Sequence, residues 1–306
     1  MPDRGPDPCP TFRGVAAEPL PPAGSKTAKD ENFPVASRFL PAHTRGAVLS
    51  LYRFARLADD VADSRELTPR AKLAALDAAD AMLLGTGDRG LGALEDGPLL
   101  TAARELRSVC REANVPVEHA RHLLQAFRKD AVQNRYETWS ELLAYCHFSA
   151  APVGRFLLAL HGEDRKAWPC ADALCNAHQI LNHVQDCKAD FLRLGRIYLP
   201  MRWLREAGAT AGMVGADAAH PALRRTLDRV LTGAGQLLDA ARPLPTMLRN
   251  RGLRIQAAAT LSAADLLLLR LRRQDPLAAA VRIGPIAKAR CAISGLARGW
   301  AAPADG

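Results

Sequence analysis

The sequence predicts an all-α protein with one large domain. Alanine, leucine and arginine, which are good helix formers, dominate the 306 residues, whereas aromatic residues make up only 5%. β-Branched residues rarely come in runs, and we find no alternation of apolar and polar residues that is typical of a strand. No stretch in the middle of the chain resembles an interdomain linker, so a single domain is expected over residues 30–300.

The first 29 residues differ from the rest of the chain. They contain MPDRGPDPCP and EPLPPAGSK, a Pro- and Gly-rich composition that cannot bury enough apolar surface to fold alone. The segment has no apolar core and carries acidic residues, which argues against a targeting peptide. Residues 1–29 are therefore predicted to be a disordered tail.

Apolar side chains recur at helical spacing after Pro41 and predict a helix of about six turns that ends near residues 67–69. Polar side chains run along this helix at successive offsets of seven, four, three, one and three residues, close to a single face. They are Arg45, Tyr52, Arg56, Asp59, Asp60 and Asp63.

Further helices are expected over residues 70–85, 101–115 and 117–136. The next helical pattern covers residues 140–162, and Pro152 and Gly154 inside it are expected to kink the helix. From about Pro221 to Trp300 the pattern predicts more amphipathic helices. Within them, ADLLLLRLRR fits a core helix with an arginine edge better than a helix on a membrane surface.

The segment from Gln179 to Pro200 reads QILNHVQDCKADFLRLGRIYLP and carries a second polar stripe. On a helix with 3.6 residues per turn, polar residues at offsets of three, four, seven and eleven from the first share one face. They are Gln179, Asn182, His183, Asp186 and Asp190. This face is polar where an ordinary helix is apolar, which indicates a ligand, although a lone helical histidine is more often structural.

Two pairs of aspartates suggest a metal site: Asp59 with Asp63, and Asp186 with Asp190. Carboxylates at i and i+4 repel each other unless a cation bridges them. One such segment is usually a solvated helix end, but two of them favour a site. Mg²⁺ binds one or two carboxylates together with phosphate oxygens, and arginines on the first stripe suit phosphate. Such a site would stabilise a departing diphosphate and leave a carbocation behind.

Composition narrows the partners. The formal net charge of +9 suits nucleic acid, anionic lipid or a polyanionic substrate. The arginines are dispersed and no nucleic-acid motif is present, which argues against nucleic acid.

Seven scattered cysteines without metal-ligand spacing indicate reduced thiols in a cytoplasmic protein. No apolar run approaches the roughly 20 residues that span a bilayer, so any membrane contact is expected to be peripheral, at the inner face.

Three motifs resemble the squalene and phytoene synthase family. FARLADDVAD is similar to the first aspartate-rich motif, and QILNHVQDCKADFLRLGRIYLP is similar to the second, which typically reads QLxNxxRDxxEDxxxGRxYLP. Between them, YETWSELLAYCHFSAAPVGRFLL is similar to the YCxxxAxxVG helix. The motifs stand in family order, and the resemblance covers roughly residues 32–290. ENFPVASRFLP, NHVQDC and APVGR are most similar to the bacterial hydroxysqualene synthase branch of hopanoid biosynthesis.

The resemblance implies an isoprenoid-synthase helical bundle with a central cavity between two aspartate-rich helices. It implies Mg²⁺-dependent ionisation of presqualene diphosphate, rearrangement of the cation and capture by water, without NADPH, and coupling to other hopanoid-pathway enzymes. The implied metal ligands are Asp59, Asp60, Asp63, Asp186 and Asp190. The implied catalytic residues are Tyr145, Asp59 and Asp63. The residues implied around the diphosphate are Arg45, Tyr52, Arg56, Gln179, Asn182 and Tyr198.

The chain departs from the family pattern in two places. Ala189 stands where the second motif usually has an acid, and Gln185 replaces its usual arginine, which weakens the second group of ligands. Asn32 and Phe33 stand where phytoene and squalene synthases usually have a Ser-Phe pair that contacts phosphate, which argues against those two activities.

Other functions stay open at this point. A presqualene diphosphate synthase would join two farnesyl diphosphates on the same scaffold, and a squalene or phytoene synthase is a further alternative, the squalene synthase with NADPH. From a different class, a non-catalytic helical protein could bind anionic lipid through its arginines. The five aspartates distinguish these classes, because a module that binds anions gains nothing from carboxylates facing its ligand without a metal.

Overall fold

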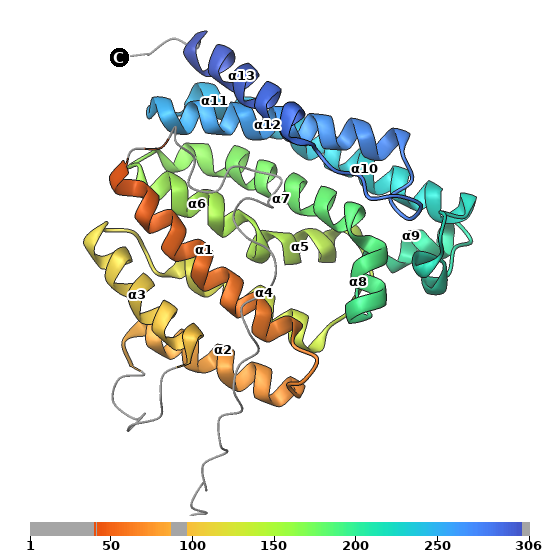
Figure 1. Ribbon diagram of the computed structural model, residues 1–306, viewed down its shortest axis with the longest axis horizontal. Helices are drawn as coiled ribbons and strands as arrows, with labels where there is room; N and C mark the ends of the chain where they lie inside the picture. Colours follow the sequence, from red (N-terminus) through yellow and green to blue (C-terminus); the bar gives the residue numbers. More distant parts are fainter. Residues whose placement is uncertain (1–39, 41, 87–96, 302–306) are drawn as a thin grey trace, which may run out of the picture.

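The computed structural model of the chain describes residues 40, 42–86 and 97–301. The predicted tail at residues 1–29 and the pair Asn32 and Phe33 lie outside the described residues. Helices make up most of the described chain, which confirms the all-α prediction (Figure 1). The helices are α1 (Ala42–Asp63), α2 (Pro69–Leu84), α3 (Pro98–Glu112), α4 (Glu118–Val132), α5 (Trp139–Ser149), α6 (Ala151–Leu160), α7 (Trp168–Gln185), α8 (Cys187–Leu194), α9 (Met201–Glu206), α10 (Pro221–Ala241), α11 (Leu244–Met247), α12 (Arg251–Arg273) and α13 (Pro285–Ala301).

Polar residues that precede the helices fix several of their starts. The hydroxyl of Thr68 accepts a hydrogen bond from the backbone N–H of Ala71 at 3.2 Å and caps α2. Thr138 caps α5 in the same way. At the other end of α2, Gly85 adopts a left-handed conformation with φ 75°, which glycine tolerates without strain.

Helix α1 ends at Asp63, a few residues before the predicted end, and α4 stops at Val132 rather than near residue 136. After α4 the chain forms a short strand, β1 (Arg135–Tyr136), which pairs in parallel with β2 (Ile197–Pro200). The sequence showed no strand pattern, so this short pair was not predicted. Strands of two and four residues are too short to produce a visible alternation in the sequence.

The second aspartate-rich segment is not one continuous helix. Helix α7 ends at Gln185, and Asp186, with φ −101° and ψ 8°, separates it from α8. The backbone N–H of Asp190 still donates to the carbonyl oxygen of Asp186 at 2.9 Å. The i, i+4 relation of these two aspartates is thus kept at the start of α8, and the residues from Ile197 leave the helix for β2.

The expected kink separates α5 from α6 at Ala150. Pro152 lies in the first turn of α6, where a missing N–H costs nothing. Gly154 allows α6 to approach α7 closely, because a Cβ at this position would lie 2.8 Å from Cys175 Sγ. The small size of Gly154 therefore permits the close contact between α6 and α7.

Two apolar clusters hold the helices together. One is built mainly from α1–α4 around side chains such as Phe54 and Leu106, and the larger one from α5, α7, α10 and α12. Figure 1 shows α2 and α3 at one side of the molecule and α12 and α13 at the other, with α6 and α7 between them. Helix α7, which carries the second polar stripe, packs against α6 and α10, and α1, which carries the first, packs against α3 and α4.

Two described segments are long and apolar enough to span a bilayer, which corrects the expectation that none is. They are Trp139–Leu160, which contains α5 and α6, and Arg251–Arg273, which is α12. Within the bundle, 50% and 67% of the apolar 18-residue window in each segment is buried. Core helices of soluble proteins pass the same test, so these segments are weak grounds for a membrane span. The interpretation of ADLLLLRLRR as a core helix agrees with this burial.

Candidate active site

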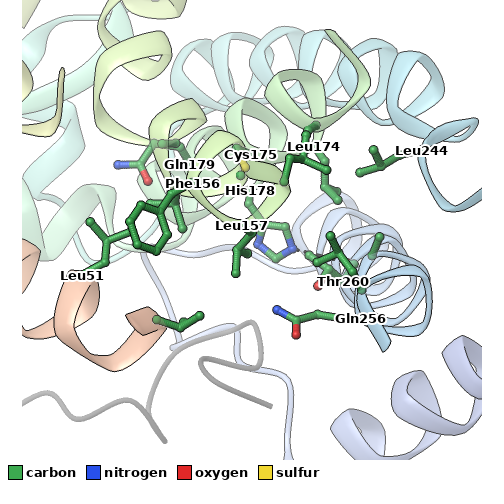
Figure 2. Close-up of a pocket in the computed structure, with 18 of the residues that line it drawn as sticks. Leu51, Phe156, Leu157, Leu174, Cys175, His178, Gln179, Leu244, Gln256 and Thr260 are labelled. Carbon is green, nitrogen blue, oxygen red and sulfur yellow. Dashed lines mark hydrogen bonds between the residues drawn. The ribbon is translucent and has the colours of Figure 1, made fainter. Parts of the chain in front are cut away.

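A cavity of about 280 Å³ lies between α1, α6, α7 and α12 (Figure 2). Most of its lining is apolar, and Leu51, Phe156 and Leu244 contribute to it from three different helices. Three of the residues predicted to surround a diphosphate also line it: Tyr52 from α1, and Gln179 and Asn182 from α7. The bundle therefore brings residues of both polar stripes to one mainly apolar cavity. A site for a long apolar substrate with a charged head group requires this combination.

The first two aspartates of α1 are paired with an arginine on the same helix. The guanidinium of Arg56 donates to Asp59 Oδ2 and to Asp60 Oδ1, each at 2.9 Å. All three side chains are largely shielded from solvent. Arg56 therefore lies beside the predicted metal ligands, where a phosphate could replace one of the carboxylates as its partner.

Asp63 connects the first motif to the second. Its Oδ1 accepts from Arg196 Nη1 at 2.5 Å, and its Oδ2 accepts from Arg193 Nη2 at 2.8 Å. Arg196 is buried and also donates to the carbonyl oxygen of Ala62. Arg196, the arginine of the Gly-Arg pair in the second motif, thus binds the end of α1. In Figure 1 this end of α1 lies close to α8. The two aspartate-rich segments are neighbours in space.

The carboxylates of α1 are electrostatically crowded. Burial, together with the neighbouring carboxylate of Asp63, raises the pKa of Asp59, against the lowering effect of Arg56. A bound cation would relieve the electrostatic repulsion among these partly buried carboxylates. The donor set of α1 therefore fits a hard divalent cation.

The second group of acids is half-buried at the start of α8, where Asp186 and Asp190 lie one turn apart. Ala189, which replaces the usual acid, is exposed, so this departure removes a carboxylate from a solvent-facing position. In the described part of the chain, no three His, Cys, Asp or Glu side chains converge closely enough to form a ready-made metal cluster. The predicted ligands thus lie in two groups, three aspartates on α1 and two at the start of α8.

Behind the polar stripe of α7 lies a stack of aromatic rings. The ring of His183 stacks on Tyr198 with centroids 3.8 Å apart, and Tyr145 lies 5.4 Å from Tyr198. Tyr136 contacts both tyrosines. Tyr145 and Tyr198 are buried here and do not line the cavity of Figure 2, and neither does Arg45.

One buried carboxylate, Asp130, organises this stack and was not singled out from the sequence. Its Oδ2 accepts from the Tyr145 hydroxyl at 2.7 Å and its Oδ1 from the Tyr198 hydroxyl at 2.8 Å. Burial raises the pKa of Asp130 to about 6, against the lowering effect of Arg196 and of the two hydroxyls. The only sequence signal was an acid near the end of a predicted helix, which is too common to single out a site.

His183 has a structural role, as the sequence favoured. Its Nε2 lies 3.3 Å from the Gln179 amide nitrogen, which can donate to the neutral imidazole. Burial, and then Arg196, lower the pKa of His183 to about 3. The neutral ring thus supports Tyr198 on one side and Gln179 on the other.

The cysteines near the site are packing residues. Cys146 and Cys187 are free and buried. Burial raises the pKa of the Cys146 thiol well above its usual range and that of Cys187 to about 12. Neither thiol forms a thiolate readily at neutral pH, which excludes them as nucleophiles.

The family model for squalene/phytoene synthase matches residues 26–287. The chain belongs to this family. Hydroxysqualene synthase from Rhodopseudomonas palustris is 40% identical over 261 residues, which cover 85% of this chain and 86% of the relative. Hydroxysqualene synthase from Sinorhizobium fredii is 38% identical over 84% of this chain and 85% of its own length. The 15-cis-phytoene synthase of a Paracoccus strain is more distant, at 30% identity over 90% and 88% of the two chains.

Solved structures confirm the fold of the family for this chain. The crystal structure of a squalene synthase from Alicyclobacillus acidocaldarius superposes with a TM-score of 0.67 at 33% identity, covering 78% of this chain and 87% of that one. A dehydrosqualene synthase in complex with a ligand gives a TM-score of 0.69 over 87% and 90% of the chains, at 22% identity. The isoprenoid-synthase bundle implied by the motifs is therefore confirmed.

Proposed function

We propose that this protein is a hydroxysqualene synthase that converts presqualene diphosphate to hydroxysqualene. The observation that carries the proposal is the meeting of the two polar stripes, through Tyr52, Gln179 and Asn182, at one apolar cavity. The relatives named hydroxysqualene synthase, at 38% and 40% identity over most of the chain, support this activity over the other reactions of the family.

In the proposed reaction, the bond between the substrate carbon and the diphosphate oxygen breaks, and both electrons leave with the diphosphate. Arg56 of α1, with Gln179 and Asn182 of α7, would bind the departing group. The carbocation rearranges, water adds to it, and the resulting oxonium loses a proton to give the alcohol. The apolar walls of the cavity would hold the hydrocarbon chains and exclude bulk water until the rearrangement is complete.

Mg²⁺ is the metal that fits these ligands best. Asp59, Asp60 and Asp63 on α1, with Asp186 and Asp190 at the start of α8, would hold it, because hard oxygen ligands beside a diphosphate suit this ion. When bound, the ion would neutralise charge on the leaving diphosphate. In the structure, Asp63 is held by the exposed Arg193 and by the buried Arg196, which orient its carboxylate. No reductant is needed, because water supplies the oxygen of the product.

Product analysis tests the proposal. The purified protein with Mg²⁺ would be given presqualene diphosphate or farnesyl diphosphate separately, with and without NADPH. Hydroxysqualene from presqualene diphosphate, unaffected by NADPH, is the expected result. Presqualene diphosphate formed from farnesyl diphosphate would assign the condensing reaction to the chain instead, and squalene formed only with NADPH would identify a squalene synthase.

A double variant tests the metal ligands. Asp59→Asn with Asp186→Asn is expected to lower turnover by about a thousandfold or more, because each group of ligands loses a carboxylate. Helical content and melting temperature should stay close to those of the wild type. A variant that still converts the substrate would contradict metal binding by these residues.

We also propose that the protein works in the cytoplasm, at the inner face of the membrane. Helix α13 exposes Ile286 and Ile293, which lie two turns apart on one face with Arg290 between them. Residues 276–301 contain no Asp or Glu, so this surface complements an anionic bilayer. Flotation with phosphatidylglycerol vesicles should recover the wild type but not Ile286→Ser with Ile293→Ser. Equal recovery of both proteins would contradict the proposal, as would self-association through this face.

A further inference from the structure

Asp130 is the point at which four separate segments meet. It lies in the last turn of α4 and is 8% exposed. Its two carboxylate oxygens each accept one hydroxyl proton, from Tyr145 on α5 and from Tyr198 on β2. Its backbone carbonyl accepts from Arg196 Nη2 at 2.9 Å, and the same arginine binds Asp63 at the end of α1. These contacts join the first aspartate-rich motif to the second.

The hydrogen bonds determine where the two hydroxyl groups point. A tyrosine hydroxyl has one proton and two lone pairs. Since both protons are directed to Asp130, the lone pairs of Tyr145 and Tyr198 must face other directions. Donation to a carboxylate also increases the electron density on the phenol oxygen and its ring. Both rings therefore become better partners for a positive charge.

The location of the cluster links it to the site. Tyr145 and Tyr198 pack against His183, at 5.9 and 3.8 Å between ring centroids. His183 in turn contacts Gln179, which lines the cavity (Figure 2). On the other side, Arg196 holds Asp63, a predicted metal ligand. The cluster thus lies between the cavity wall and the first aspartate-rich motif.

We propose that Asp130 is a positioning residue that fixes and polarises Tyr145 and Tyr198 behind the cavity wall, so that these electron-rich rings, through the His183 ring packed against them, favour the positive charge formed in the cavity after diphosphate departure. This inference rests on the proposed function. Asp130 does not itself contact the substrate and gains or loses no proton in the reaction. It keeps two hydroxyl groups in one orientation before the charge develops, so no reorganisation is needed when it does. Buried Arg196 stays charged beside it, because Tyr198, Asp130 and Asp63 raise its pKa although burial opposes this.

Kinetics of hydroxysqualene formation from presqualene diphosphate test the role. Asp130→Asn preserves the shape but replaces one acceptor with a donor, so one tyrosine must turn its hydroxyl away. We expect kcat to fall by about tenfold or more with KM changed by less than about threefold. Adding Asp130→Asn to the Tyr145→Phe, Tyr198→Phe variant should cause no further fall in kcat, because the carboxylate then has no hydroxyl to orient.

Two further variants separate positioning from general stability. Asp80→Asn removes a carboxylate that binds Arg121 and Arg128 away from the site, and it should leave kcat unchanged. Asp130→Glu keeps the charge and both acceptor oxygens. It should restore part of the activity lost in Asp130→Asn, and it provides the comparison if the asparagine variant does not fold.

The outcomes are distinct. Independent, multiplying effects of Asp130→Asn and the tyrosine changes would overturn the proposal, as would an equal loss in Asp80→Asn, or wild-type kcat in Asp130→Asn. If the wild type makes no hydroxysqualene from presqualene diphosphate, the proposed function fails instead. In that case the same set of variants, assayed on the product that the wild type does make, decides the positioning role separately.

Discussion

Single residues of the first motif have different partners although they are adjacent in sequence. Asp60 is held by Arg56 of its own helix, whereas Asp63 is held by Arg196, which precedes β2 and lies more than a hundred residues away in sequence. A local pair such as the first can be read from an i, i+4 spacing. The pair of Asp63 and Arg196 cannot be predicted in this way, because the fold of the intervening chain determines whether the two side chains come into contact.

At the same scale, the burial of a single histidine makes the stability of the folded protein depend on pH. His119 on α4 is buried against Phe156 and Trp168, and neither ring nitrogen has a hydrogen-bond partner among the described residues. Burial, with His122 and Arg155 nearby, lowers its pKa to about 4. Below about pH 6.5 His119 of the unfolded chain binds a proton, whereas His119 of the folded protein stays neutral until about pH 4. The free energy of unfolding therefore decreases as the pH is lowered across this range.

We therefore expect His119→Phe to reduce the loss of stability between pH 6.5 and pH 4. The wild type should lose at most about 3 kcal/mol through His119 in this range, since each pKa unit corresponds to about 1.4 kcal/mol. His183, with a pKa of about 3, contributes a similar loss that the variant retains. Urea unfolding at several pH values measures the slope, and an unchanged slope in the variant would contradict the assignment.

At the scale of elements, a close contact between α6 and α7 beside the cavity depends on a glycine. A side chain at Gly154 of α6 would collide with Cys175 of α7, and both residues line the cavity. We expect Gly154→Val to destabilise the protein by about 1–3 kcal/mol, because the helices must separate. Adding Cys175→Ala should recover part of this loss.

A glycine on α1 provides the control for that experiment. Gly46 is helical and exposed, and a Cβ there would meet nothing within 4 Å. Gly46→Val should therefore change stability by less than about 0.5 kcal/mol in the same urea titration. Equal losses in the two valine variants would show that helix propensity, and not the contact between α6 and α7, determines the effect.

At the scale of the whole molecule, ligand binding should join segments that are far apart in sequence. Mg²⁺ together with inorganic pyrophosphate is expected to raise the melting temperature, because a ligand at a hundred times its Kd stabilises the folded state by about 2.7 kcal/mol. Asp59→Asn with Asp186→Asn should abolish this rise. The surface variant Asp77→Asn with Asp239→Asn should retain it, and a rise that survives in the first variant would contradict metal binding by these aspartates.

Much of this architecture could be predicted from the sequence. Helix periodicity predicted α1, α2, α3 and the kink between α5 and α6, since both the apolar spacing and the position of Pro152 are local features. The break at Asp186 and the pairing of β1 with β2 were missed. The pairing joins segments that are distant in sequence, and both features leave only a few residues of pattern in the chain.

The sequence by itself determined the family, the helical class and the two polar stripes, because motif spacing and 3.6-residue periodicity are properties of contiguous segments. Only the tertiary structure decided that Tyr145 and Tyr198 share one buried acceptor, Asp130, and that Arg196 joins it to Asp63. A buried carboxylate costs free energy unless its partners surround it. Those partners come from α5 and β2, and only the packing of the bundle brings them to the end of α4.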